Sequence, residues 1–371
     1  MWRRRWWWWP GRCAFESHGR RVCRIRRRAD QLPGTIGVGD LDGDGAPDVY
    51  LRGIDQGLGG GHASTRDTLR NDGAGHLTEK PLSSSVLSCG SVLIGDATRD
   101  GRADVTCLYG AYPGLDIESD DGDGSLSRTV SSMSVSGAIA LVEAPAARGL
   151  VSADGTSDVS ALMVSSNAIT KSVIASAPVP VNTVTGGDVD GDGVPDLIAY
   201  GESTGDLSFF DGQTLARRDF TVALPDAGVS FIAGLPRGGR SLFGFANATA
   251  ATSGLLVIVP VVDGVPQSRA MYDVASDAPP RIGDLDGDGV PDLVFVGIDD
   301  PSVMWMRGHA DGTLTPARPV LLTGTVTGSY RGLVVVDLDL DGRSELMVED
   351  AVFDSQTGTN TTSLHVFHAQ Q

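Results

Sequence analysis

Four aspartates fall within nine residues near the start of the chain, in the stretch GDLDGDGAPDVYL at residues 39–51. They stand at positions 1, 3, 5 and 9 of a loop whose sixth position is glycine. Ca²⁺ takes about six to eight oxygen ligands, largely carboxylates and backbone carbonyls, and glycine permits the sharp turn around the ion. The spacing therefore predicts a calcium loop, with ligands from the side chains of Asp40, Asp42, Asp44 and Asp48 and from the carbonyl of Ala46 at position 7.

The same loop recurs three more times with every acidic position filled, so about four Ca²⁺ sites are predicted. The expected ligands are Asp188, Asp190, Asp192 and Asp196 with the carbonyl of Val194; Asp284, Asp286, Asp288 and Asp292 with that of Val290; and Asp337, Asp339, Asp341 and Glu345 with that of Arg343. A fifth copy has threonine at position 3 and is a weaker candidate, because it keeps only Asp96, Asp100 and Asp104.

An exposed Asp-Gly turn is the alternative interpretation, because aspartate and glycine dominate turns in general. Repetition of the whole spacing favours the metal loop over a chance turn. The match to an EF-hand is only partial, since no glutamate stands at position 12 and strand-like segments flank the loop. A calcium loop within a β-hairpin is therefore predicted.

The loops mark an internal repeat. Their first positions are residues 40, 96, 188, 284 and 337, and two faint copies at 150 and 234, expected to bind nothing, fill the gaps. Each strong unit has an apolar strand, the loop, a second apolar strand and a later Gly/Asp turn with a trailing strand. Units of about 40–50 residues made only of strands are typical of propeller blades. The prediction is an all-β, seven-bladed propeller of four-stranded blades over residues 31–371.

At these loops the chain resembles the FG-GAP/VCBS repeat proteins, which include the propeller of integrin α subunits. The five acidic loops with their flanking strands carry the resemblance, and LRNDGAGHLTEK at residues 69–80 is similar to the second half of the family's repeat. It extends from about residue 33 to the C-terminus. The resemblance implies a seven-bladed propeller with structural Ca²⁺ on one face, in an extracellular protein that binds partners on the opposite face.

The N-terminal segment differs from the rest. Ten of the 29 basic residues, but only one of the 47 acidic ones, lie in residues 1–28, together with five of the six tryptophans. We interpret residues 1–30 as a disordered tail or a mis-assigned start; a basic, aromatic arm for nucleic acid or membrane is the alternative. It lacks the apolar core of a signal peptide. No apolar run is long enough to span a membrane, and the acidic remainder should repel nucleic acid.

Two other motifs give weaker evidence about function than the acidic loops. Cys89 and Cys107 flank one acidic loop on two expected strands, and they form either a cross-strand disulfide or two buried thiols. The stretch GESTG at residues 201–205 matches the pattern of a nucleophile elbow, but a strand follows it where the elbow needs a helix. A turn is therefore predicted there, and no catalytic residue is assigned.

These patterns together predict a non-enzymatic, calcium-stabilised binding or adhesion module that is secreted or displayed at the cell surface. A protein or glycan ligand, no nucleic acid, no membrane insertion and a monomeric state are expected. The alternatives are a secreted enzyme acting on polysaccharide, as a lyase or hydrolase, and a lectin on the same scaffold.

Overall fold

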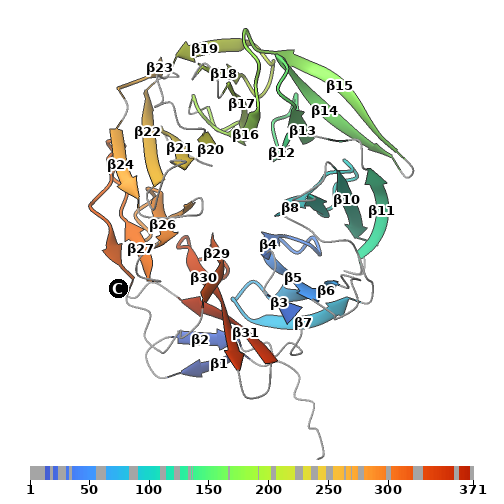
Figure 1. Cartoon of the computed structure of the whole chain (residues 1–371), viewed down its shortest axis with the longest axis vertical. Coiled ribbons are helices and arrows are strands. Elements are labelled where there is room, and N and C mark those ends of the chain that lie inside the picture. Colours follow the sequence, from blue (N-terminus) through green and yellow to red (C-terminus); the bar gives the residue numbers. More distant parts are fainter. Residues whose placement is uncertain are drawn as a thin grey trace, which may run out of the picture.

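The computed structural model describes the chain in segments. They are residues 13–16, 20–23, 31–32, 36–55, 64–82, 91–108, 114–120, 126–132, 135, 137–165, 168–190, 192–201, 206–221, 229–234, 241–247, 254–262, 265–268, 270–274, 280–297, 302–320, 329–354 and 359–367. The regular elements in these segments are β-strands, arranged around a central axis as a β-propeller of small antiparallel sheets (Figure 1). The predicted all-β propeller is confirmed. No helix in the described segments is long and apolar enough to cross a membrane.

The described strands fall into seven sheets of four or five strands. The first contains β3 (Gln31–Leu32), β4 (Ile36–Gly39), β5 (Asp48–Asp55), β6 (Ser64–Asn71) and β7 (Leu77–Leu82). The second contains β8 (Ser91–Gly95), β9 (Asp104–Leu108), β10 (Leu115–Asp120) and β11 (Leu126–Ser132). The third contains β12 (Ala138–Val142), β13 (Gly149–Ala153), β14 (Asp158–Ser165) and β15 (Ala168–Ser176).

The fourth sheet contains β16 (Thr183–Gly187), β17 (Asp196–Gly201), β18 (Asp206–Phe210) and β19 (Arg217–Thr221). The fifth contains β20 (Val229–Gly234), β21 (Ser241–Asn247), β22 (Gly254–Val262), β23 (Val265–Pro266) and β24 (Ala270–Val274). The sixth contains β25 (Arg281–Gly283), β26 (Asp292–Val296), β27 (Val303–Met306) and β28 (Arg318–Pro319). The seventh joins β29 (Ser329–Val336), β30 (Glu345–Asp354) and β31 (Thr359–Phe367) to β1 (Cys13–Glu16) and β2 (Arg20–Cys23).

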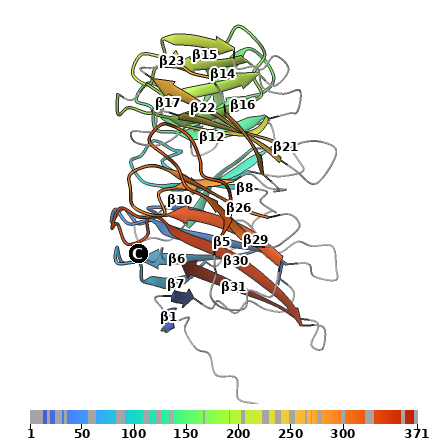
Figure 2. The same ribbon diagram turned by 90° about the vertical axis from the view of Figure 1, so that its left-hand side faces the viewer.

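The core lies between neighbouring sheets. The second strand of a sheet is apolar nearly throughout, as in DLIAYG of β17, because both of its faces are covered. Leu69 packs with Met347 between the first and seventh sheets, and Leu256 packs with Phe295 between the fifth and sixth. Seen from the side, β29, β30 and β31 run across the thickness of the ring (Figure 2). Each sheet packs between two neighbouring sheets, and the loops that join its strands lie at the ends of those strands.

The innermost strands approach closely around the axis. β4 contacts β8 and β29, and β12 contacts β8 and β16. Glycines permit this approach: a Cβ on Gly37 would lie 2.7 Å from Cγ1 of Val92, and one on Gly332 would lie 2.7 Å from Cδ1 of Ile36. The innermost strands therefore need glycine at these positions in order to pack closely around the axis.

Two parts of the chain far apart in sequence meet in the seventh sheet. β2 pairs with β31 in antiparallel register, with Arg21 opposite Val366 and Cys23 opposite Leu364. Residues 1–30 were interpreted as a disordered tail or a mis-assigned start; in the structure two short strands of that segment extend the sheet. A strand at a sheet edge has unpaired backbone N–H and C=O groups. Those of β31 pair with β2, the second strand of the N-terminal hairpin. Residues 1–12 lie outside the described residues.

The third unit corrects one sequence alignment. Its Asp-Gly stretch at 154–158 was aligned with the metal loops, which join the innermost strand to the second. In the structure residues 154–157 join β13 to β14, the second and third strands of the sheet, while 143–148 join β12 to β13. Asp154 pairs there with Lys171 at 2.5 Å. The unit's first position, at Leu150, was therefore wrong, because an Asp-Gly turn suits either end of a hairpin equally well.

The remaining motifs have mixed outcomes. A strand, β18, follows residues 201–205, as the turn interpretation requires. Cys107 of β9 is buried and disulfide-bonded. Cys89 lies outside the described residues, so its pairing with Cys107 stays a prediction. The faint fifth-unit loop after Gly234 also lies outside them.

Candidate metal centres

The four complete acidic loops occupy equivalent places in their sheets. Each joins the innermost strand to the second strand, as β4 to β5 and β25 to β26. Hydrogen bonds also connect neighbouring loops, in one case through Asn71 at the end of β6, which bonds to Pro47 and Asp48 of the first loop. The N–H of Ser344 donates to the carbonyl of Asp284 at 2.6 Å, and Nδ2 of Asn71 donates to the carbonyl of Leu338 at 2.6 Å. The loops starting at residues 284, 337 and 40 therefore form one continuous band on a single face.

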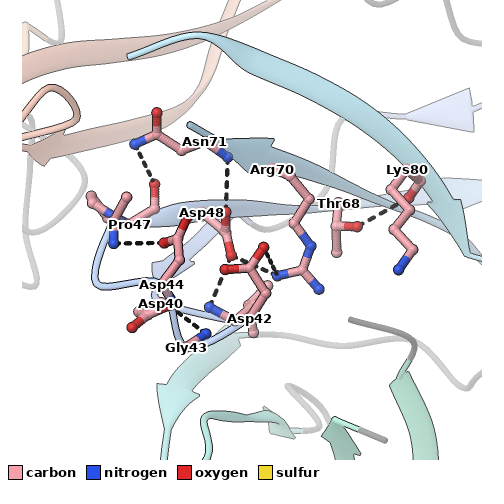
Figure 3. A network of polar contacts seen from close by, with 12 residues as sticks. Asp40, Asp42, Gly43, Asp44, Pro47, Asp48, Thr68, Arg70, Asn71 and Lys80 are labelled. Atoms are coloured by element: carbon pink, nitrogen blue, oxygen red, sulfur yellow. Dashed lines mark hydrogen bonds and ion pairs between the residues drawn. The ribbon is translucent and has the colours of Figure 1, made fainter. Parts of the chain in front are cut away.

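Position 1 of each loop organises the turn. In the first loop Oδ1 of Asp40 accepts hydrogen bonds from the N–H groups of Gly43 at 2.8 Å and Asp44 at 3.1 Å, and Oδ2 accepts one from Gly45 at 2.9 Å (Figure 3). Gly43 and Gly45 have φ of 78° and 90°, a region that favours glycine. Asp284 receives the same three bonds from its own loop.

Position 9 is a buried carboxylate. Asp48 is 0% exposed, and its two oxygens accept bonds from the N–H groups of Leu41 and Asn71, each at 2.9 Å. Asp196 and Asp292 are held by the equivalent pairs of N–H groups. Burial raises the pKa of each of these two to about 6, although the N–H donors act in the opposite direction. Ionising these groups therefore costs more than ionising an exposed aspartate, and a cation nearby would offset that cost.

The structure brings positions 1, 3 and 9 together. In each group one carboxylate oxygen per residue lies within 4.8 Å of the others. The groups found among the described residues are Asp40, Asp42 and Asp48; Asp188, Asp190 and Asp196; Asp284, Asp286 and Asp292; and Asp337, Asp339 and Glu345. Three carboxylates at this separation could hold a metal ion, and an all-oxygen set suits a hard cation such as Ca²⁺ or Mg²⁺.

Position 5 caps the turn of its own loop in the structure. The Oδ1 atoms of Asp44, Asp192, Asp288 and Asp341 accept the N–H of the residue at position 7, at 2.7–2.9 Å. These carboxylates are outside the three-residue groups. Their part in binding an ion therefore stays a prediction, as does that of the position-7 carbonyls of Ala46, Val194, Val290 and Arg343.

The second unit, from Asp96 to Asp104, keeps the loop with weaker chemistry. Its positions 1, 3 and 9 present three buried oxygens without a hydrogen-bond partner: Oδ1 of Asp96, Oγ1 of Thr98 and Oδ1 of Asp104. Oδ2 of Asp96 accepts a bond from Arg148 of the next sheet at 2.7 Å. Oδ1 of Asp100 accepts the N–H of Arg102 at 2.9 Å. The loop therefore combines two converging carboxylates with one neutral hydroxyl and an arginine.

Arginines at the loops were missed by the sequence analysis. Arg70 contacts Asp48 at 2.6 Å, and Arg307 contacts Asp286 at 2.6 Å and Asp288 at 2.7 Å. Arg218 reaches Asp190 only at 3.9 Å. The sequence signal of Arg70 and Arg307 is a basic residue two or four positions before the Asp-Gly pair of the third hairpin, at Asp72 and Asp311, a stretch that was interpreted only as a turn marker.

Comparisons with known proteins agree with this architecture. Residues 284–348, which contain two of the acidic loops, match the family model of the FG-GAP-like repeat. No curated protein matches the chain. Together with the propeller fold, the match confirms the resemblance to the FG-GAP/VCBS repeats predicted from the sequence.

Solved structures share the fold at low identity. A protein from Lactobacillus plantarum is 15% identical with a TM-score of 0.50, over 82% of this chain and 93% of that one. The Dos1 propeller is 9% identical with a TM-score of 0.50, over 92% of this chain and 95% of that one. At these identities the likeness concerns the fold alone.

Proposed function

From the FG-GAP-like repeat and the propeller around it, we propose that this chain is a calcium-stabilised, non-enzymatic binding module. Each of the seven described sheets is assigned to one blade, since the innermost strands follow one another around the axis. One face carries the metal loops, and the opposite face is proposed to bind a protein or glycan ligand.

The four carboxylate groups are the observation that carries this proposal. Each gathers three acidic side chains within 4.8 Å, and one of them is buried at 5% exposure or less. Like charges this close repel one another, and a buried carboxylate resists ionisation. A divalent ion would offset both effects and would link the first strand of a blade to the second through position 9.

Calcium and an extracellular location are supported by the same chemistry. The loops lack a bidentate glutamate at position 12, and their outer carboxylates are partly exposed. Sites of modest affinity suit extracellular modules, where the Ca²⁺ concentration keeps weak sites filled. We therefore propose that the protein works outside the cell or at its surface.

The proposal is tested by counting bound ions. Metal-free protein is dialysed against ⁴⁵Ca²⁺, and the expected result is about four ions per chain. Asp286→Asn should remove about one ion, because it takes a charge from the group at Asp284, Asp286 and Asp292. Asp154→Asn is the matched control, because its loop lies at the other end of its sheet. Binding of no ions, or equal stoichiometry in Asp286→Asn and the wild type, would contradict the assignment.

A further inference from the structure

An arginine enters the first loop from the hairpin that joins the third strand to the fourth. Nη1 of Arg70, near the end of β6, donates to Oδ2 of Asp48 at 2.6 Å and lies 3.9 Å from Oδ2 of Asp42. Both carboxylates belong to the group that could hold an ion. Figure 3 shows the guanidinium directed at the loop from the neighbouring strand. A positive charge of the chain itself thus lies against two of the three expected ligands.

A second arginine enters the loop at 284–292 in the same way. Nε of Arg307 lies 2.6 Å from Oδ2 of Asp286, and Nη2 donates to Oδ2 of Asp288 at 2.7 Å. Bonds between a guanidinium and carboxylates are strong because both partners are charged. The Arg307 side chain is 45% exposed, so it can also turn into solvent.

The two arginines occupy one equivalent position. The residue after each donates its N–H to the buried carboxylate at position 9: Asn71 to Asp48 at 2.9 Å, and Gly308 to Asp292 at 2.8 Å. In the loop at 188–196 that N–H belongs to Gly212, which donates to Asp196 at 2.9 Å. The residue before Gly212 is Asp211. The side chain at this position therefore changes sign between loops.

The loop at 188–196 is correspondingly open and acidic. A small pocket beside it is lined by Asp190, Asp196 and Asp211, together with Val189, Phe209, Ala216 and Arg218. Asp211 directs Oδ1 to the N–H groups of Gln213 and Thr214 in its own turn. Arg218 approaches Asp190 only to 3.9 Å. The place that a guanidinium takes in the other two loops thus borders a pocket here.

We propose that Arg70 and Arg307 are built-in competitors of the divalent ion. In the ion-free protein they offset part of the negative charge of the loops at 40–48 and 284–292, and an ion that enters must displace them from its ligands. The loop at 188–196 has no such competitor at this position, so it binds the ion more tightly than those two loops. This inference rests on the proposed function, because it assumes that the loops bind a divalent ion.

The expected change in the binding constant of the ion follows from the charge of the arginine. A unit charge a few ångström from a divalent ion at a protein surface changes its binding constant about ten-fold or more. Displacing the arginine also breaks its bonds to the carboxylates. Removing Arg307 should therefore tighten binding at its own loop and leave the others unchanged. Arg70 is more buried, at 13% exposure, so Arg307 is the better position for a test.

The test is a calorimetric Ca²⁺ titration of the metal-free full chain. Arg307→Gln should bind one ion about ten-fold more tightly than the wild type. Arg217→Gln is the matched control, because Arg217 also pairs with an aspartate, Asp219 at 3.0 Å, and is similarly exposed at 43%. The gain should vanish in Arg307→Gln combined with Asp286→Asn, which places it at this loop.

A converse variant tests the open loop. Asp211→Arg should weaken binding at the loop at 188–196 about ten-fold, whereas Asp211→Asn keeps the turn and separates the loss of a charge from the addition of one. Binding by the wild type with unchanged affinity in Arg307→Gln would overturn the inference and leave the proposed function standing. Absence of Ca²⁺ binding in the wild type and in Arg307→Gln would overturn both.

Discussion

The loops at 188–196 and 284–292 are nearly identical in sequence but differ in their surroundings. GDVDGDGVPDL and GDLDGDGVPDL differ at one residue, Val189 against Leu285, and both bury the aspartate at position 9. Their third hairpins carry Asp211 in one case and Arg307 in the other. The repeat therefore determines the shape of the loop, while a residue at least 15 positions further along the chain changes the charge beside it.

The two loops share a buried carboxylate at position 9, which should give the largest of the predicted effects. The pKa of Asp196 and of Asp292 is about 6 in the folded protein and 3.8 in the reference state. Raising the pH from 4 to 7 removes the proton from the unfolded chain first, so the free energy of unfolding of metal-free protein should fall. The loss over this range is about 2 kcal/mol for each group.

The measurement is urea denaturation in EDTA across this pH range. Asp292→Asn and Asp196→Asn should each remove a similar share of the slope, because both groups are buried in the same way. Saturating Ca²⁺ should flatten the slope of the wild type, because the ion stabilises the charged form. A metal-free wild type whose stability rises from pH 4 to pH 7, with both variants parallel to it, would contradict the burial argument.

The loop at 337–345 differs from two of the other loops at position 4, and this difference should have a smaller effect on the free energy of unfolding. Gly43 and Gly287 occupy it with φ of 78° and 76°, while Leu340 adopts φ of 57° and is 56% exposed. A leucine in this left-handed region costs about 1 kcal/mol or more. Leu340→Gly should therefore raise the free energy of unfolding by about 1 kcal/mol.

Leu340→Ala is the control for that variant. Alanine keeps the Cβ and hence the backbone strain, so no gain is expected from it. The two variants are compared by urea denaturation in EDTA, where no ion contributes. Equal stability of Leu340→Gly and Leu340→Ala would show that the loop at 337–345 holds its left-handed residue without strain.

Much of the fold follows from local patterns. The first strand, the acidic loop and the apolar second strand were predicted in four units, because strand periodicity and a nine-residue spacing are local signals. The turn at 72–76 between β6 and β7 was found for the same reason. The third unit was misaligned at Leu150, because Asp-Gly turns occur at both ends of a hairpin and only pairing distinguishes the ends.

The rest depends on contacts between distant residues. Arg70 meets Asp48 across 22 residues, and β2 meets β31 across most of the chain. Position 5 was assigned as a ligand from its spacing, which could not show that Oδ1 of Asp44 also accepts the N–H of Ala46. Spacing indicates which residues share a loop, whereas the direction of each side chain depends on the backbone turn and on neighbouring strands.

The central claim is that a divalent ion bound in these loops holds the propeller together. A ligand that binds only the folded state must raise its stability. The most direct measurement is the thermal melting of the full chain in millimolar Ca²⁺ and in EDTA at pH 7.4. The account predicts a melting temperature higher by at least about 5 °C in Ca²⁺. Coincident melting curves would contradict it.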